Sequence, residues 1–440
     1  MWVFPALGNQ LYFVRVPLTL LIYWETFYSG AWPKRGGLIF AAYAFTFLCI
    51  LIVLIQAYFR LSFGNEELLV AAVGMYNYCF YLFLAAILAC RASQETISIV
   101  TKTLLVLMII NCPVSVVQFW APASSWLNSG ISLDPSAQFH SLGIALGHVR
   151  PSGTFTASNG LAALIPFTFA TLIAFVLVSP RRRSIDVSAR LMWVAAFAAA
   201  VALAFCGSRN VYAAVAIVLI FGVFAGLLCG SNRALSVSLM LPAAAATIVV
   251  IVFPLVFPTS TEAFAARIQS ADASEADSFL LGPLGRGLYY IFNFVYYFDS
   301  TPFFGHLLGI ASNAVGRSAT VSLPPEAALW REAGGWGGWA EVSFSKHIVE
   351  LGPVVGSGFI VFRMLILTSS IRLGLLAARN AGNPYPLVMA SLVLIYMLFF
   401  QITSQGTDIG ICWIFVGMFF AICRLESTTD QSRCRPSAPS

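Results

Sequence analysis

The chain has 440 residues, of which 59% are apolar and only 10% are charged, and its formal net charge is +6. Soluble domains contain roughly 45–50% apolar and about 25% charged residues, so this composition excludes an ordinary soluble protein. The positive charge is not gathered in a basic patch interleaved with aromatic residues, so no nucleic-acid partner is expected.

Apolar segments of about 20 residues, the length at which a helix crosses a hydrocarbon core of about 30 Å, recur along the chain. The predicted spans are 38–59, 68–90, 97–118, 156–178, 189–206, 210–229, 235–257, 347–370, 383–402 and 407–424. An eleventh segment, 6–25, is interrupted by Arg15 and Glu25 and fits a tilted span, an interfacial helix or a truncated start. The predicted fold is all-α, a polytopic membrane bundle of about 10–11 transmembrane helices.

Lysine and arginine residues of the short loops collect on one side of these spans, and the positive-inside rule makes that side cytoplasmic. It holds Lys34, Arg35, Arg91, Lys102, Arg181, Arg182, Arg183, Arg190, Arg233, Arg372 and Arg379. The opposite short loops hold only Arg60, Arg150 and Arg209. The chain therefore divides into N-terminal transmembrane helices (1–257), a large outer loop (258–346), C-terminal transmembrane helices (347–425) and a cytoplasmic tail (426–440).

The outer loop is far longer than a connector needs, and loops beyond roughly 12–15 residues are usually functional or disordered. Its stretch 281–298 is rich in tyrosine and phenylalanine, which favours a helix in the membrane interface over a platform that stacks on sugar rings. The loop contains no cysteine, so it forms no disulfide. No Cys/His spacing resembles a zinc site, and neither a metal nor another cofactor is expected.

Arg150 and Arg209 stand at the mouths of apolar segments on the outer side, where such charges are rare. A guanidinium matches phosphate oxygens in a bidentate way, so two of them on different helices could hold a pyrophosphate. The alternatives are contact with lipid headgroups or pairing with an acid such as Glu341 or Glu350. Four further arginines of the outer loop are candidates for extra phosphate contacts: Arg267, Arg286, Arg317 and Arg331.

His347 lies three residues before Glu350 at the entrance of the span 347–370, so both side chains could share one helical face. A functional role for this pair and a plain interfacial histidine at the end of the loop are both open. His148 is close to Arg150 in sequence, and simple exposure explains its position.

Several short motifs resemble those of the O-antigen ligase and O-antigen polymerase superfamily. They are Arg150-Pro151-Ser152-Gly153-Thr154-Phe155 followed by Ala157-Ser158-Asn159-Gly160, then Ser208-Arg209, and Glu350-Leu351-Gly352 after a long outer loop. The resemblance covers roughly residues 140–370. It implies a metal-independent glycosyltransferase in the bacterial cytoplasmic (inner) membrane that uses undecaprenyl-pyrophosphate-linked glycans, with the loop 258–346 in the periplasm. A chain-length regulator is a further candidate partner.

The resemblance has one departure from the family pattern. Ligases of the superfamily carry a His-Asn pair about nine residues before Glu-Leu-Gly, where this chain has Glu341, while the nearby histidine is His347. Either Glu341 replaces the histidine as the catalytic base, or His347 supplies it after a shift of register. This departure favours a polymerase of repeat units over a ligase.

Transfer of a sugar from a pyrophosphate needs a base for the acceptor hydroxyl and positive charge for the leaving group. We expect Glu341 or His347 to act as the base and Arg150 and Arg209 to bind the pyrophosphate, with Arg286, Arg331 and Glu350 as additional site residues. One base implies direct displacement with inversion. A ligase, or a transporter of small anions or glycan lipids, is the alternative.

Overall fold

The computed structural model describes residues 15–59, 64–128, 144–155, 158–178, 186–229, 232–275, 292–310, 343–380, 382–400, 402–403 and 406–433. Within these ranges the chain is almost entirely helical, and a two-stranded antiparallel hairpin is the one sheet. Eight helices are long and apolar enough to cross a membrane, and two shorter apolar helices, Ala189–Phe205 and Tyr385–Phe399, accompany them. The prediction of a multi-pass all-α membrane protein is confirmed.

Each of the predicted spans has a helical counterpart. The elements are α3 (Gly37–Phe59), α4 (Asn65–Met75) continued by η2 (Tyr76–Phe80) and α5 (Tyr81–Arg91), α6 (Gln94–Trp120), α8 (Ser158–Leu177), α9 (Ala189–Phe205), α10 (Arg209–Leu228), α11 (Asn232–Thr247) continued by η4 (Ile248–Val252) and α12 (Phe253–Val256), α17 (Ser343–Asn380), α18 (Tyr385–Phe399) and α19 (Gly406–Arg433). At the N-terminus, α2 (Arg15–Tyr28) has 14 residues. Residues 1–14, which precede it, lie outside the described ranges, so the prediction for segment 6–25 stays open.

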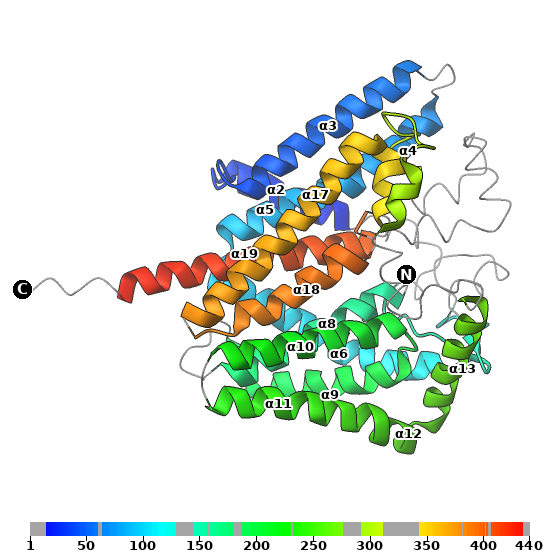
Figure 1. Cartoon of the computed structure of the whole chain (residues 1–440), viewed down its shortest axis with the longest axis vertical. Helices are drawn as coiled ribbons and strands as arrows, with labels where there is room; N and C mark the ends of the chain where they lie inside the picture. The colour runs from blue at the N-terminus through cyan, green and yellow to red at the C-terminus, as the bar shows by residue number, and fades with distance from the viewer. Residues whose placement is uncertain are drawn as a thin grey trace, which may run out of the picture.

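The helices form two groups that pack side by side (Figure 1). One group contains α3, α5, α17, α18 and α19, and the other contains α6 and α8 to α12, with α8 and α10 packed against α18 where the groups meet. Phe167 of α8 stacks on Phe415 of α19 across this boundary, with ring centroids 5.1 Å apart. Gly417 lets α19 approach α5 closely, because a Cβ there would lie 2.8 Å from the Leu88 side chain.

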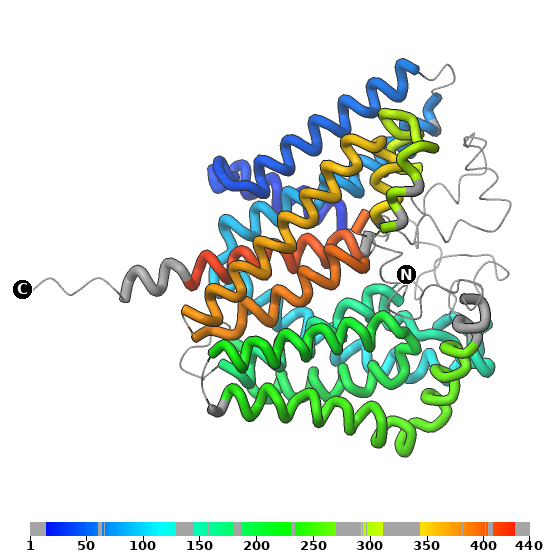
Figure 2. The backbone as a smooth tube through the Cα atoms, in the orientation of Figure 1, coloured from blue at the N-terminus to red at the C-terminus, as the bar shows by residue number. Residues whose placement is uncertain are grey.

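Small elements gather at one end of the bundle, which we name the outer end after the predicted orientation. Helix α13 (Pro258–Glu275) lies across this end of the second group, beside the hairpin of β1 (Ile144–Ala145) and β2 (His148–Val149), while α19 runs towards the opposite end (Figures 1 and 2). Of the predicted aromatic helix 281–298, the part from 292 onward is described, and it contains a short 3-10 turn, η5 (Asn293–Tyr297), packed on α17. Residues 281–291 lie outside the described ranges.

The segment Thr301–Ile310 contacts α3, α4 and α17, and its second half, 307–310, is buried. Gln56 of α3 fixes it: its Nε2 donates to the Phe304 carbonyl at 2.7 Å and to the Glu350 carbonyl at 3.1 Å, and its Oε1 accepts from the Leu308 N–H at 3.0 Å. Gly309 approaches Gly74 of α4 so closely that a Cβ on Gly74 would lie 2.5 Å from the Gly309 nitrogen. This part of the loop is therefore built into the bundle.

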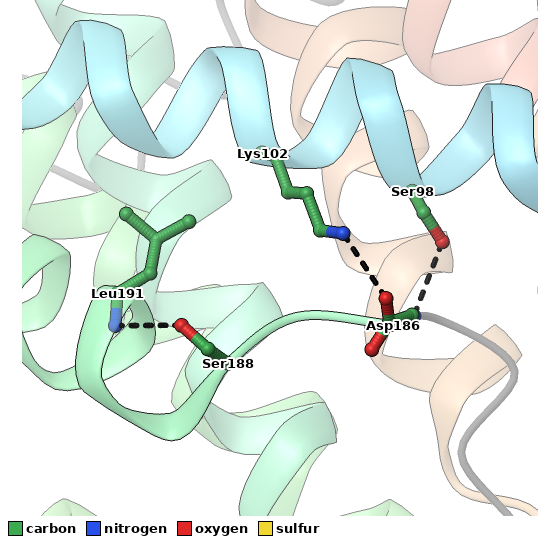
Figure 3. Close-up of polar contacts among 5 residues, drawn as sticks. All are labelled: Ser98, Lys102, Asp186, Ser188 and Leu191. Atoms are coloured by element: carbon green, nitrogen blue, oxygen red, sulfur yellow. Dashed lines mark hydrogen bonds and ion pairs between the residues drawn. The ribbon is translucent and has the colours of Figure 1, made fainter.

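Polar contacts fix the connection between α8 and α9 at the predicted cytoplasmic end (Figure 3). Lys102 Nζ lies 3.1 Å from Asp186 Oδ2, the Asp186 N–H donates to Ser98 Oγ at 3.1 Å, and Ser188 caps α9 by accepting from the Leu191 N–H at 3.3 Å. The Asp186 side chain is 91% exposed, so we expect the ion pair itself to contribute less than about 1 kcal/mol.

The orientation can be tested with single cysteines at opposite ends of the bundle. Glu262 on α13 and Asp186 are both exposed. We expect a membrane-impermeant maleimide to label a Glu262→Cys variant in intact cells, and an Asp186→Cys variant only after the membrane is permeabilised, because the arginine-rich loops remain inside. The unsubstituted chain gives the background from native cysteines, and the reverse labelling pattern would overturn the orientation.

Candidate anion site at the outer end of the bundle

The two arginine motifs singled out in the sequence meet at the outer end of α9 and α10. Arg150 follows the β1–β2 hairpin, and its Nη2 donates to Ser208 Oγ at 2.7 Å. Ser208 is the residue that precedes α10, and Arg209 is the first residue of that helix, where it is half-buried. Arg150 therefore contacts the residue immediately before Arg209, and the joint role of the two arginines stays a prediction.

Arg267 of α13 joins the same corner. Its Nη2 donates to the His148 carbonyl at 2.9 Å, and a Cβ on Gly207 would lie 1.8 Å from its Nη1. Gly207 has φ of +55°, so this glycine supplies both the left-handed backbone and the space in which the guanidinium lies. Of the loop arginines named from the sequence, Arg267 is the one whose contact with this corner is described.

The electrostatics of this corner favour an anion. Burial lowers the pKa of the Arg150 guanidinium, and for Arg267 burial is the main cause of a lowered pKa and the Arg150 charge is the second. Burial raises the pKa of the Cys206 thiol to about 11, so the thiol carries no negative charge at neutral pH. Among the described residues no carboxylate contacts Arg150. A bound anion would relieve the repulsion between the two guanidiniums.

Buried amides of α6 hold the chain that carries Arg150. Gln118 accepts from the backbone N–H groups of Ser152 and Gly153 at 3.1 and 2.8 Å, and Asn111 accepts from the Thr154 N–H at 2.7 Å. Neither amide was among the residues predicted from the sequence. The signal that could have found them is their i, i+7 spacing in the mostly apolar stretch 104–120, which places them on one helical face.

A second polar cluster lies inside the first group of helices, where α17 breaks at Gly352 with φ of +81°. Lys346 Nζ lies 3.7 Å from Glu350 Oε1 and donates to the Thr403 carbonyl at 2.7 Å. All three residues are buried. Glu350, predicted as an additional site residue, is thus the counter-charge of Lys346.

His347 is fully buried in this second cluster. Its Nε2 lies 3.0 Å from Arg363 Nη1, and its Nδ1 lies 2.9 Å from Tyr78 Oη. A guanidinium can only donate, so Nε2 accepts and the proton of the neutral ring is on Nδ1, which donates to Tyr78. Both ring nitrogens are engaged, and Tyr78 is a partner of both His347 and Glu350, which are one helical turn apart.

Arg363 and Asp408 extend the cluster towards the second group of helices. Arg363 Nη2 donates to the carbonyls of Tyr396, at 3.3 Å, and Met397. A charged side chain therefore satisfies carbonyls of the last turn of α18 at its outer end. Asp408 in the first turn of α19 accepts from Asn159 Nδ2 at 2.8 Å. Asn159 stands near the start of α8, directly after the Arg150 motif, so this bond links the two groups of helices.

Several predicted site residues, Glu341, Arg286, Arg317 and Arg331, lie outside the described ranges. Their roles remain predictions.

Comparison with known proteins does not assign the chain to a family. No protein-family model matches the sequence, and no curated protein or solved structure shows significant similarity to it.

The buried guanidinium of Arg363 should be essential for stability. We expect Arg363→Met to lower the free energy of unfolding by about 3–5 kcal/mol, because the carbonyls of α18 and His347 Nε2 lose their donor in the bundle interior. Thermal unfolding of the purified protein in detergent measures the effect. Arg372→Met, at an exposed position of the same helix, is the matched control and should change the midpoint little.

The role of the space beside Gly207 can be tested without substituting an arginine. Gly207→Ala should displace the Arg267 guanidinium and weaken binding of inorganic pyrophosphate on the order of tenfold, or about 1.4 kcal/mol. Binding is read from the rise in unfolding midpoint with pyrophosphate concentration. Gly147→Ala imposes similar left-handed strain, since Gly147 has φ of +79°, but has no atom within 4 Å of the new Cβ and should retain affinity. Equal affinities for both variants would contradict the assignment of Arg267 to the site.

Proposed function

We propose that this chain is a glycan polymerase of the bacterial cytoplasmic membrane. It transfers an oligosaccharide from undecaprenyl pyrophosphate onto a second lipid-linked glycan outside the membrane, during assembly of a surface polysaccharide or exopolysaccharide. The observation that carries the proposal is the placement of Arg150, Arg209 and Arg267 around one corner of the bundle. Their combined charge at the end of apolar helices suits the head group of a lipid pyrophosphate whose tail lies in the bilayer.

The reaction follows from the roles of these groups. The acceptor hydroxyl oxygen attacks the anomeric carbon of the donor sugar, and the bond from that carbon to the pyrophosphate oxygen breaks. The bonding pair leaves with the lipid pyrophosphate, whose growing negative charge is stabilised by the guanidiniums, and the hydroxyl proton passes to a carboxylate base. One displacement inverts the anomeric configuration. The guanidiniums supply the positive charge that other transferases obtain from a metal ion.

Of the two candidate bases we favour Glu341. A base needs a free lone pair within reach of the acceptor hydroxyl. His347 has none in this arrangement, because its Nε2 accepts from Arg363 and its Nδ1 carries the proton donated to Tyr78. We therefore assign His347 a structural role in α17. The expectation for Glu341 is that Glu341→Gln abolishes transfer while pyrophosphate still binds.

Two other functions use parts of the same structure. A ligase would use the same donor and differ in its acceptor, a finished lipid core. A transporter of small anions or glycan lipids is supported by one observation: α17 is broken at Gly352 beside the buried charges of Lys346 and Glu350, and broken helices with charged residues occur in transporters. A transporter would move its substrate without forming a glycosidic bond.

Deletion of the gene, followed by gel analysis of surface and secreted polysaccharide, separates these functions. A polymerase mutant should lose long chains and retain a single repeat. Accumulation of unattached lipid-linked polymer would indicate a ligase instead, and an unchanged glycan profile would overturn both.

The role of Arg150 can be tested in the purified protein. Arg150→Lys keeps the charge and loses the bidentate fork, so we expect transfer from a lipid pyrophosphate donor to fall on the order of tenfold to a hundredfold. Arg372→Lys, at the exposed position of α17, should transfer at the rate of the parent chain. Full activity of an Arg150→Ala variant would rule out the phosphate-binding role. Activity should also survive chelation of divalent metals with EDTA.

A further inference from the structure

The outer end of α6 positions Arg150 and Arg267, the two arginines whose contacts in the anion site are described. Residues 104–120 of α6 are apolar except for a buried polar face formed by Asn111, Ser115 and Gln118, all of which are fully inaccessible to solvent. Buried amides in a membrane helix are retained only where they have partners. Here the partners are backbone groups of the Arg150 loop.

Gln118 makes a four-point contact with non-helical backbone. Its Oε1 accepts from the N–H groups of Ser152 and Gly153, and its Nε2 donates to the carbonyls of Gly153, at 3.0 Å, and Leu127, at 2.9 Å. All the hydrogen-bonding capacity of the amide is used. The loop is thus fixed two residues after Arg150, and Pro151 between them has a restricted backbone.

Asn111 fixes the next residue of the loop. Its Oδ1 accepts from the N–H and from Oγ1 of Thr154, at 2.7 and 3.2 Å, while its Nδ2 donates to the Leu107 carbonyl at 2.7 Å. Gly153 has φ of +66°, and a Cβ there would lie 2.1 Å from Asn111 Oδ1, so the loop rests directly on the amide. This contact accounts for the glycine of the Arg-Pro-Ser-Gly-Thr-Phe motif.

The position of Arg267 depends on the same helix end. The His148 ring stacks on Phe119 with centroids 4.4 Å apart and planes 2° from parallel, and its Nδ1 lies 3.1 Å from the Phe119 carbonyl. The His148 carbonyl in turn accepts from Arg267. Consecutive residues of α6, Gln118 and Phe119, therefore determine where both guanidiniums lie.

We infer that Gln118, supported by Asn111, is a positioning and specificity-determining residue: it sets the spacing of the Arg150 and Arg267 guanidiniums so that they fit the two phosphates of a pyrophosphate group better than a single phosphate. The inference deepens the proposed function and rests on it. A diphosphate can engage both forks at once, whereas a monophosphate engages one of them fully. Loss of the spacing should reduce the preference for pyrophosphate, a change that general destabilisation does not produce.

The test compares affinities for inorganic pyrophosphate and inorganic phosphate in the full-length protein in detergent, measured by the ligand-dependent rise in unfolding midpoint. We expect Gln118→Met to weaken pyrophosphate binding about tenfold and phosphate binding much less. Thr154→Val removes only the exposed hydroxyl that donates to Asn111, so it should fold normally and reduce the preference by about two- to threefold.

Gln56→Leu is the matched control, because Gln56 is also a buried glutamine that holds a loop, away from the arginines. It should lower the unfolding midpoint and leave the ratio of the two affinities unchanged. If the Thr154→Val and Gln118→Met variants both keep the ratio of pyrophosphate to phosphate affinity of the parent chain, the role of α6 is overturned and the proposed function is left intact. A parent chain that does not bind pyrophosphate would overturn both.

Discussion

Polar groups taken out of water at the end of a membrane bundle need partners from the protein itself, and this constraint shapes the region around Arg150. Residues 150–155 are not helical, so their N–H and carbonyl groups lack the partners that a helix supplies. The amides of Gln118 and Asn111 take their place. No described carboxylate contacts Arg150, and the charges of Arg150 and Arg267 repel each other, which is why we propose an anionic ligand at this corner.

In the buried cluster around Lys346 and Arg363, the protein itself also supplies partners for the polar groups. Among the described residues, Lys346 and Arg363 are buried cations and Glu350 and Asp408 are buried carboxylates, so these four formal charges balance. Arg363 donates to His347 Nε2 and to two carbonyls at the end of α18. The two polar regions therefore differ in charge: carboxylates offset the cations in this cluster, whereas no described carboxylate contacts Arg150.

The helices were predictable because length and apolarity alone dictate a transmembrane span, and each predicted span overlaps a helix, although α17 ends at Asn380 instead of 370 and α19 at Arg433 instead of 424. Arg150 and Arg209 could be placed at the ends of apolar segments because the charge rule and their motifs are local properties of the sequence. The hydrogen bonds from Gln118 to the Arg150 loop, and the space at Gly207 that holds the Arg267 guanidinium, depend on tertiary contacts among α6, α10 and α13. No local sequence pattern encodes such contacts. His347 illustrates the limit: its spacing from Glu350 was read correctly as one helical turn, but Arg363, sixteen residues away, determines its hydrogen bonding.

The docking of Thr301–Ile310 through Gln56 has a consequence for how α3 and α17 are joined. The Gln56 amide bonds this segment at Phe304 and Leu308 and bonds α17 at the Glu350 carbonyl, so one buried side chain connects three segments that are far apart in the sequence. Its loss would deprive a buried N–H and two carbonyls of this partner at once, and each such loss costs about 1–3 kcal/mol. The segment therefore cannot leave the bundle without also loosening the contact between α3 and α17.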